Sequence, residues 1–360
     1  PELYDGDRIA LTLQRTDGSK YMVETDYKRY GDIDWLGRDS LYTDITRAEY
    51  VGRREGFARQ DAERNAWRYD GYEHLFATPG YDCWINDQER AFLLQWNLFR
   101  SDIRDDMQKL LDYAEENDKL DYAIIWDGLN SRGGNYAVWM LQRMQGTPFR
   151  TTFGNLRISD ITPALAAELR EWAQGRVAES GEHADIVPVE DILEPDNGQF
   201  LIDWLDRDLA KAIESGQAYS NNVPFKNYYL PAYSDGVVNP AEVHFTGPIV
   251  LLVGPAGCSQ VDQFVSMVID NGLGYAVGME AGGCSNTWEW EEDLTFPGRD
   301  EPIAKYMWTA GHTIRPNSEI LEGNSSPVDV YIPLMRDNYL DYYDLLLGEA
   351  YRYIETQRDR

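Results

Sequence analysis

Ser259 is the residue of this chain whose type and surroundings best suit chemistry. It follows an apolar segment, PIVLLVGPAGC, and precedes an amphipathic one, QVDQFVSMVIDNG. The pattern predicts a buried strand, a glycine-rich turn and a helix that begins at the serine. The hydroxyl of such a serine is free of the helix, and the first N–H groups and positive dipole end surround any oxyanion beside it. This arrangement suits acyl transfer.

A purely structural interpretation of the same residues is also open. Ser259 is followed three residues later by Asp262, which is the spacing of a capping box worth about 1 kcal/mol. A phosphate-binding loop is excluded, because VGPAGCS lacks the lysine and the second-glycine spacing that hold phosphates. The segment alone leaves a helix cap and a nucleophile as alternatives.

A second strand, glycine loop and helix occur earlier in the chain. The apolar run Tyr122–Trp126 leads into a loop with Gly133 and Gly134 and then into a helix over Ala137–Met144. If both strands belong to one parallel sheet, both loops open at the same edge, where α/β proteins bind ligands. We therefore expect an α/β fold with Ser259 close to the paired glycines.

The remaining segments suggest how this core is extended. Alternating apolar residues around Asp17-Gly18 predict a hairpin, assigned with residues 1–30 to a β domain, and 31–75 form a connecting segment. We expect the core over 76–360, with a helix that Ser101 caps and a helical insertion over about 160–220.

Composition limits the possible partners. The net charge of −29 and the pI of about 4.4 argue against nucleic acid as a partner, because binding it needs clustered Lys and Arg. A strongly acidic surface also suits saline surroundings, where salt screens the repulsion between like charges. No apolar run approaches the ~20 residues of a membrane span. The start, PELYDGD, has no signal-peptide pattern and resembles the interior of a longer chain.

The three cysteines indicate neither a metal site nor a disulfide scaffold. Cys83, Cys258 and Cys284 form no CxxC pattern and no even-numbered framework. We expect Cys258 to be a small buried residue in the turn, and we expect no metal ion and no organic cofactor.

Three stretches, taken together, resemble the C-terminal processing, or tail-specific, serine peptidases. IIWDGLNSRGGN resembles their strand that ends in two glycines, the segment around Ser259 resembles their nucleophile block, and TIRPNSEILEGNSSPVDVYIP resembles their closing stretch. The order and spacing match over roughly residues 75 to 350. The resemblance implies a ClpP/crotonase-like α/β core, and the N-terminal hairpin is similar to the last strands of a PDZ domain.

The resemblance also implies roles for individual residues. Ser259 would attack a peptide carbonyl, and the oxyanion would be held by the amide of Gln260 and an amide of the Gly133-Gly134 loop. Glu322 would orient the base, with Glu319 as the alternative.

The base is the main departure from this pattern. In the bacterial processing branch it is a lysine 25 residues after the serine, where this chain has Cys284, and Lys305 lies too far along the chain. The Gly282-Gly283 pair resembles the tricorn-type branch, which uses a histidine upstream of the PDZ domain, so we expect the base outside this chain. Within the chain His312 is the best candidate. We expect the three other histidines to be structural or solvated: His74, His183 and His244.

These observations favour an exported serine endopeptidase, periplasmic or extracellular, that acts on proteins or peptides. A catalytically inactive ligand- or peptide-binding protein on the same fold is the alternative. Chemistry on an acyl thioester is disfavoured, because no basic cluster is available to bind a nucleotide phosphate. The sequence does not indicate an oligomeric state.

Overall fold

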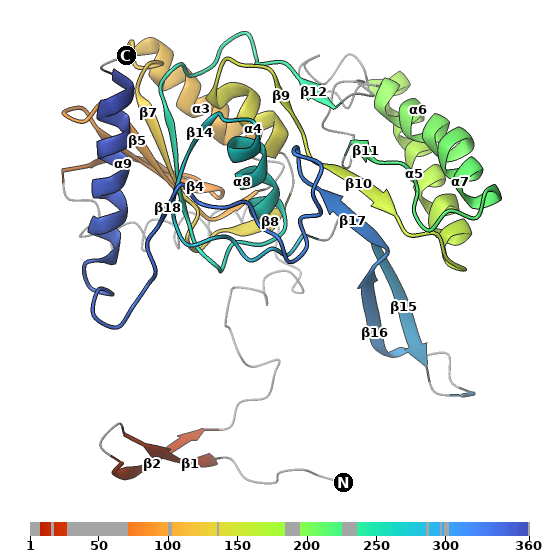
Figure 1. Ribbon diagram of the computed structural model, residues 1–360, viewed down its shortest axis with the longest axis horizontal. Helices are drawn as coiled ribbons and strands as arrows, with labels where there is room; N and C mark the ends of the chain where they lie inside the picture. Colours follow the sequence, from red (N-terminus) through yellow and green to blue (C-terminus); the bar gives the residue numbers. More distant parts are fainter. Residues whose placement is uncertain are drawn as a thin grey trace. The chain divides into compact units, whose positions relative to one another are not determined.

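A computed structural model gives the structure of the chain, which divides into two compact units, Pro1–Phe57 and Ala58–Arg360 (Figure 1). In the first unit β1 (Arg8–Gln14) and β2 (Lys20–Asp26) pair antiparallel, so the predicted hairpin is present. The structure describes residues 8–15, 18–26, 71–99, 103–134, 137–183, 195–224, 236–285, 288–295, 297–298 and 302–358.

The predicted connecting segment, 31–75, lies outside the described residues except at its end. There the prediction is wrong, because strand β3 already begins at Glu73. Ser101, the expected cap of a helix, also lies outside the described residues, and the helix itself is described from Ile103.

The second unit contains a seven-stranded mixed sheet in the order β18-β14-β13-β7-β5-β4-β3. The five strands from β18 to β5 run parallel, and β4 is antiparallel to both of its neighbours. The strands are β3 (Glu73–Ala77), β4 (Tyr81–Asn86), β5 (Ala91–Trp96), β7 (Ala123–Asp127), β13 (Ile249–Val253), β14 (Gly274–Gly278) and β18 (Val330–Tyr331).

Side chains alternate between two cores because neighbouring residues of a strand point to opposite faces. On β7, Ile124 and Trp126 join the larger core, whereas Ala123 and Ile125 join the smaller one. Both faces are covered, which explains why the strand reads as one continuous apolar run.

Helices cover the two faces unequally (Figure 1). The larger core contains residues of α3 (Ile103–Glu116), α4 (Ala137–Met144) and α8 (Gln260–Asp270), and the smaller core contains residues of α9 (Tyr342–Arg358). The predicted α/β class is therefore confirmed. None of the described helices combines the length and the apolar character of a bilayer span.

A further sheet and a helical block lie beside this core. In the sheet, β10 (Phe153–Leu156) lies between β11 (Val223–Pro224) and β17 (Gly311–Ile314). The segment expected to be helical contains α5 (Thr162–His183), α6 (Pro195–Trp204), the π-helical turn Leu205–Leu209 and α7 (Ala210–Glu214). Shorter pairs are β6 (Leu98–Phe99) with β8 (Arg132–Gly134), β9 (Phe149–Arg150) with β12 (Val237–Val238), and β15 (Glu289–Thr295) with β16 (Pro302–Thr309).

Candidate active site

Ser259 lies in a strained turn between β13 and α8. Its φ of 61° and ψ of −124° are rare for a residue with a side chain, and such strain costs about 1–3 kcal/mol. The Ser259 hydroxyl makes no capping hydrogen bond, so the capping-box interpretation is wrong. A sharp strand-to-helix turn of this kind exposes a serine oxygen above the sheet, as the nucleophile turn of α/β-hydrolases does.

The segment 282–284 holds this turn in place. The Ser259 N–H donates to the Cys284 carbonyl oxygen at 2.5 Å, and the Gly282 N–H donates to the Gly257 carbonyl oxygen at 2.7 Å. A disulfide joins Cys258 to Cys284, with their Cα atoms 5.1 Å apart. The expectation of no disulfide is therefore wrong, because the adjacent parallel strands β13 and β14 bring the two loops together.

Gly133 faces the serine. A Cβ atom placed on Gly133 would lie 2.6 Å from Ser259 Oγ and 3.1 Å from the Gln260 nitrogen, and closer still to Ser259 Cβ. Only a glycine fits there. Gly134 is constrained for another reason, because its φ is +139° and a Cβ atom would overlap the carbonyl oxygen of Phe99.

Gln260 supplies a free N–H group at this point. It is the first residue of α8, its side chain is buried, and its N–H has no hydrogen-bond acceptor among the described residues. The first N–H groups of a helix have no intrahelical partner. This donor therefore lies next to the serine with its bonding capacity unused, as an oxyanion requires.

Asp262 lies in the first turn of α8 and is only 1% exposed. Burial raises the pKa of its carboxyl to about 6, even though the N–H groups of Cys284 and Gly283 donate to it at 3.0 and 3.2 Å. The negative charge of Glu322 raises the pKa as well, so the two carboxylates are close enough to repel each other.

The two glutamates singled out from the sequence have different surroundings. Both carboxylate oxygens of Glu322 lie 3.0 Å from the N–H of Thr313, which leaves further acceptor capacity. Glu319 is exposed and accepts hydrogen bonds from Arg315, Asn317 and Asn324.

None of the described imidazoles forms a hydrogen bond with the Ser259 hydroxyl. His312 lies on β17, where it is paired with Asn155 of β10. The centre of its ring lies 4.9 Å from the centre of the Tyr219 ring. His312 precedes Thr313, whose N–H donates to the Glu322 carboxylate.

The other histidines lie elsewhere in the fold. His74 is on β3, four strands from β13 and so about 19 Å across the sheet. His244 precedes β13, at the end of that strand opposite to the serine, and its Nδ1 donates to the Ala241 carbonyl oxygen at 2.7 Å. His183 is the last residue of α5 rather than a loop residue.

Two sulfurs and a carboxylate gather beside the serine. A sulfur of Cys258, a sulfur of Cys284 and an oxygen of Asp262 lie within 4.8 Å of one another. This is a set of atom types that binds metals, but a metal ion needs thiolates. Because the two sulfurs are bonded to each other, the set does not offer those ligands in this form.

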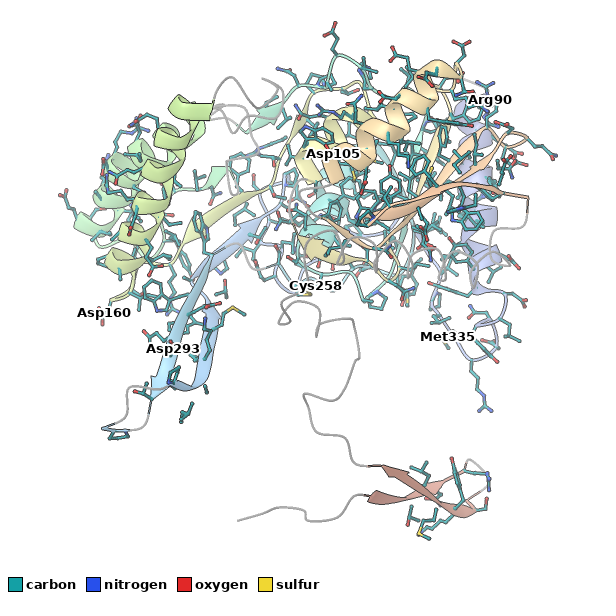
Figure 2. The ribbon with its side chains drawn as sticks, turned by 180° about the vertical axis from the view of Figure 1, so that it is seen from behind. Arg90, Asp105, Asp160, Cys258, Asp293 and Met335 are labelled. Carbon is teal, nitrogen blue, oxygen red and sulfur yellow. A yellow bond between two sulfur atoms is a disulfide. The ribbon has the colours of Figure 1, made fainter. Side chains whose placement is uncertain are left out.

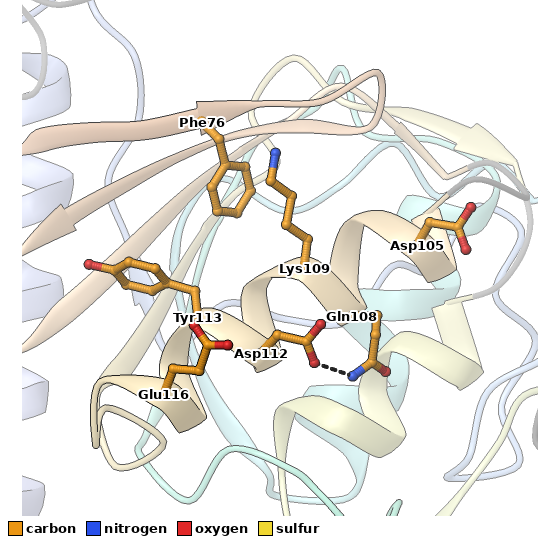
Figure 3. A pocket seen from close by; sticks show the side chains of 7 residues that line it. All are labelled: Phe76, Asp105, Gln108, Lys109, Asp112, Tyr113 and Glu116. Atoms are coloured by element: carbon orange, nitrogen blue, oxygen red, sulfur yellow. Dashed lines mark hydrogen bonds between the residues drawn. The ribbon is translucent and has the colours of Figure 1, made fainter.

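Cavities among the described residues also border other parts of the fold. One of about 690 Å³ is bordered by the loops 280–283 and 323–327 and by the buried pair Arg315 and Asp270. Another of about 460 Å³ lies between α3 and the edge strand β3 (Figure 3). In the second cavity Lys109 Nζ lies 4.3 Å from the centre of the Phe76 ring, and no serine, cysteine or histidine lines it. It is therefore not a site for acyl transfer.

No family model matches the chain, and no curated protein matches it in sequence. Solved structures do match it. Mature CPAF in complex with lactacystin superimposes with a TM-score of 0.58 at 14% identity, over 97% of this chain and 68% of that one. This chain shares the fold of CPAF. A second structure of mature CPAF gives a TM-score of 0.55 at 16% identity, over 94% of this chain and 65% of that chain.

The same fold is found in a candidate peptidase from Parabacteroides merdae. Its TM-score is 0.50 at 11% identity, over 82% of this chain and 69% of that one. This chain thus spans about two thirds of the length of the CPAF structures. The shared fold agrees with the peptidase resemblance of the sequence motifs.

Proposed function

We propose that the protein is a serine endopeptidase of the C-terminal processing type, with Ser259 as the nucleophile. The Ser259 oxygen attacks the carbonyl carbon of a peptide bond, and its proton passes to a base. The resulting oxyanion accepts the Gln260 N–H and a second N–H from the Gly133-Gly134 loop. The amine then leaves, and water hydrolyses the acyl-enzyme.

One observation carries this proposal. A serine in a strained turn faces a glycine and a helical N–H, and neither its hydroxyl nor that N–H has a hydrogen-bond partner among the residues that the structure describes. Such strain persists only where the surroundings enforce it, and it concentrates at functional sites. An oxyanion donor is worth about 2.7–4 kcal/mol of barrier, so its placement beside the serine has a use that packing does not supply.

The base in this proposal is an imidazole that Glu322 orients. Glu322 supports it because, within the part of the chain that the structure describes, the N–H of Thr313 is the hydrogen-bond donor to this carboxylate, and a carboxylate can accept several donors. His312 is the histidine within the chain to test first.

The disulfide also supports the expected location. Disulfides form and persist in oxidising compartments such as the periplasm and the cell exterior. The Cys258–Cys284 bond therefore favours a protein that works after export.

The test uses the protein expressed from its complete gene and a fluorophosphonate probe, which reacts with activated serines. We expect the wild type to be labelled and Ser259→Ala to remain unlabelled, while the exposed control Ser215→Ala keeps the wild-type rate. An unlabelled wild type would contradict the proposal and favour a binding protein on this fold, and a labelled Ser259→Ala would contradict the assignment of Ser259 as the nucleophile. His312→Ala should lose labelling if His312 is the base, and an unchanged rate assigns the base to another group.

A further inference from the structure

The disulfide beside the serine has the features of a reactive one. Its two cysteines differ in exposure, since Cys284 is exposed and Cys258 is half-buried, and Figure 2 shows Cys258 at the margin of the core. A buried carboxyl oxygen, that of Asp262, lies within 4.8 Å of both sulfurs.

Thiol–disulfide exchange needs an accessible sulfur to attack and a second sulfur that can leave. An external thiolate can reach the exposed Cys284, and Cys258 then departs as a thiolate. Cys258 stands immediately before Ser259, the cap of α8. The positive end of that helix favours a thiolate and makes Cys258 the better leaving group.

Asp262 can supply the proton that the departing thiolate needs. Once it has given up the proton, its carboxylate accepts the N–H groups of Gly283 and Cys284, which stabilise the charge. Burial, together with the charge of Glu322, raises the pKa of Asp262 to about 6, so part of the population carries this proton near neutral pH.

We propose that Cys258, Cys284 and Asp262 form a redox site that a small thiol opens, and that opening it releases the turn that holds Ser259. In the first step the thiolate sulfur bonds to Cys284, the bond between Cys258 and Cys284 breaks, and Asp262 protonates Cys258. A second thiol then attacks the mixed disulfide, so that Cys284 leaves reduced and the reductant leaves as its own disulfide.

The effect on Ser259 rests on the proposed function. In the open form the turn is held by hydrogen bonds alone, chiefly the Ser259 N–H to Cys284 and the Gly282 N–H to Gly257. A strained conformation persists only when its surroundings enforce it. The peptidase would thus be suppressed in a thiol-rich compartment and become active where the disulfide can form.

The chemistry of the site is tested without the peptidase activity. Native protein is treated with glutathione, trapped, and mapped by mass spectrometry. We expect an initial disulfide between Cys258 and Cys284, and then glutathione on Cys284. The opening rate per glutathione thiolate should fall about tenfold per pH unit above pH 6 and be flat in Asp262→Asn, whereas a variant of the exposed Glu115, Glu115→Gln, should behave as wild type. Absence of the disulfide, glutathione on Cys258, or equal pH profiles in Asp262→Asn and wild type would overturn the proposal.

The link to the serine is tested by fluorophosphonate labelling of oxidised and dithiothreitol-reduced protein. We expect labelling about tenfold slower after reduction and restored on reoxidation. Cys83→Ser should respond as wild type does, and the double variant Cys258→Ser/Cys284→Ser should be slow in both conditions. Equal rates in the two conditions would overturn the gating, whereas absence of labelling in oxidised protein would count against the peptidase and leave the glutathione experiment to decide the redox site.

Discussion

Gly133→Ala directly perturbs the contact between the glycine loop and the serine. The new methyl group would lie 2.6 Å from Ser259 Oγ and 3.1 Å from the Gln260 nitrogen. Carbon atoms pack at about 3.5–4.0 Å, so the two loops must separate by about 1 Å. A displacement of that size at reacting atoms costs about 100-fold in rate. We therefore expect fluorophosphonate labelling of Ser259 about 100-fold slower than in the wild type.

The assay is the second-order rate constant of labelling, measured with the urea midpoint of each protein. Gly348→Ala is the matched control, because Gly348 lies inside α9 and a Cβ atom there would meet nothing within 4 Å. It should keep the labelling rate and gain about 0.5–1 kcal/mol of stability. If folded Gly133→Ala reacted within twofold of the wild type, Gly133 and Ser259 would not share a reaction site, and the reasoning would fail.

Three further predictions concern stability. Ser259→Gly should raise the free energy of unfolding by about 1 kcal/mol in urea, because glycine relieves the strained φ, while labelling is lost. Asp270→Asn should lower it by about 3 kcal/mol, because the Arg315 guanidinium, 3% exposed, loses its buried charged partner and keeps only the exposed Glu319 at 3.3 Å. Asp262 binds a proton more readily in the folded protein than in the unfolded chain. The stability gained from this proton is present below about pH 4 and is lost as pH rises through about 6. Urea denaturation should therefore show the wild type losing about 2 kcal/mol of stability relative to Asp262→Asn between about pH 4 and pH 7.

The elements that carry the site could be predicted because their signals are local. Helix α4 begins at Ala137 and ends at Met144, where the sequence predicted it, and β13 is the apolar run that precedes Ser259. The parallel pairing of β7 with β13 followed from the repeated order of strand, glycine loop and helix.

The disulfide could not be deduced from cysteine spacing alone, since it depends on which strands are neighbours. Val253 and Gly278 are paired at the ends of β13 and β14. Cys258 follows the first of these residues by five positions, and Cys284 follows the second by six. Nearly equal offsets from adjacent parallel strands bring two loops together, and this signal could have identified the pair.

The separate requirements of the paired glycines also come from tertiary contacts. Gly133 is confined by Ser259, which is more than one hundred residues away, and Gly134 by the carbonyl oxygen of Phe99. Phe99 belongs to β6, a strand of only two residues with no periodicity that a sequence pattern could reveal. The sequence could therefore indicate a glycine turn without showing which neighbour each glycine accommodates.

Position 284 concerns both the base of the proposed mechanism and the disulfide that holds the Ser259 turn. In the bacterial processing peptidases that the motifs resemble, the base is a lysine 25 residues after the serine, and Cys284 occupies that position here. Its carbonyl oxygen accepts the Ser259 N–H at 2.5 Å, so a residue at this position lies against the nucleophile turn. A side chain there can reach the serine, but that of Cys284 is bonded to Cys258. Because a disulfide sulfur is a poor proton acceptor, position 284 fixes the turn in this chain, and the proposed mechanism takes its base from another group.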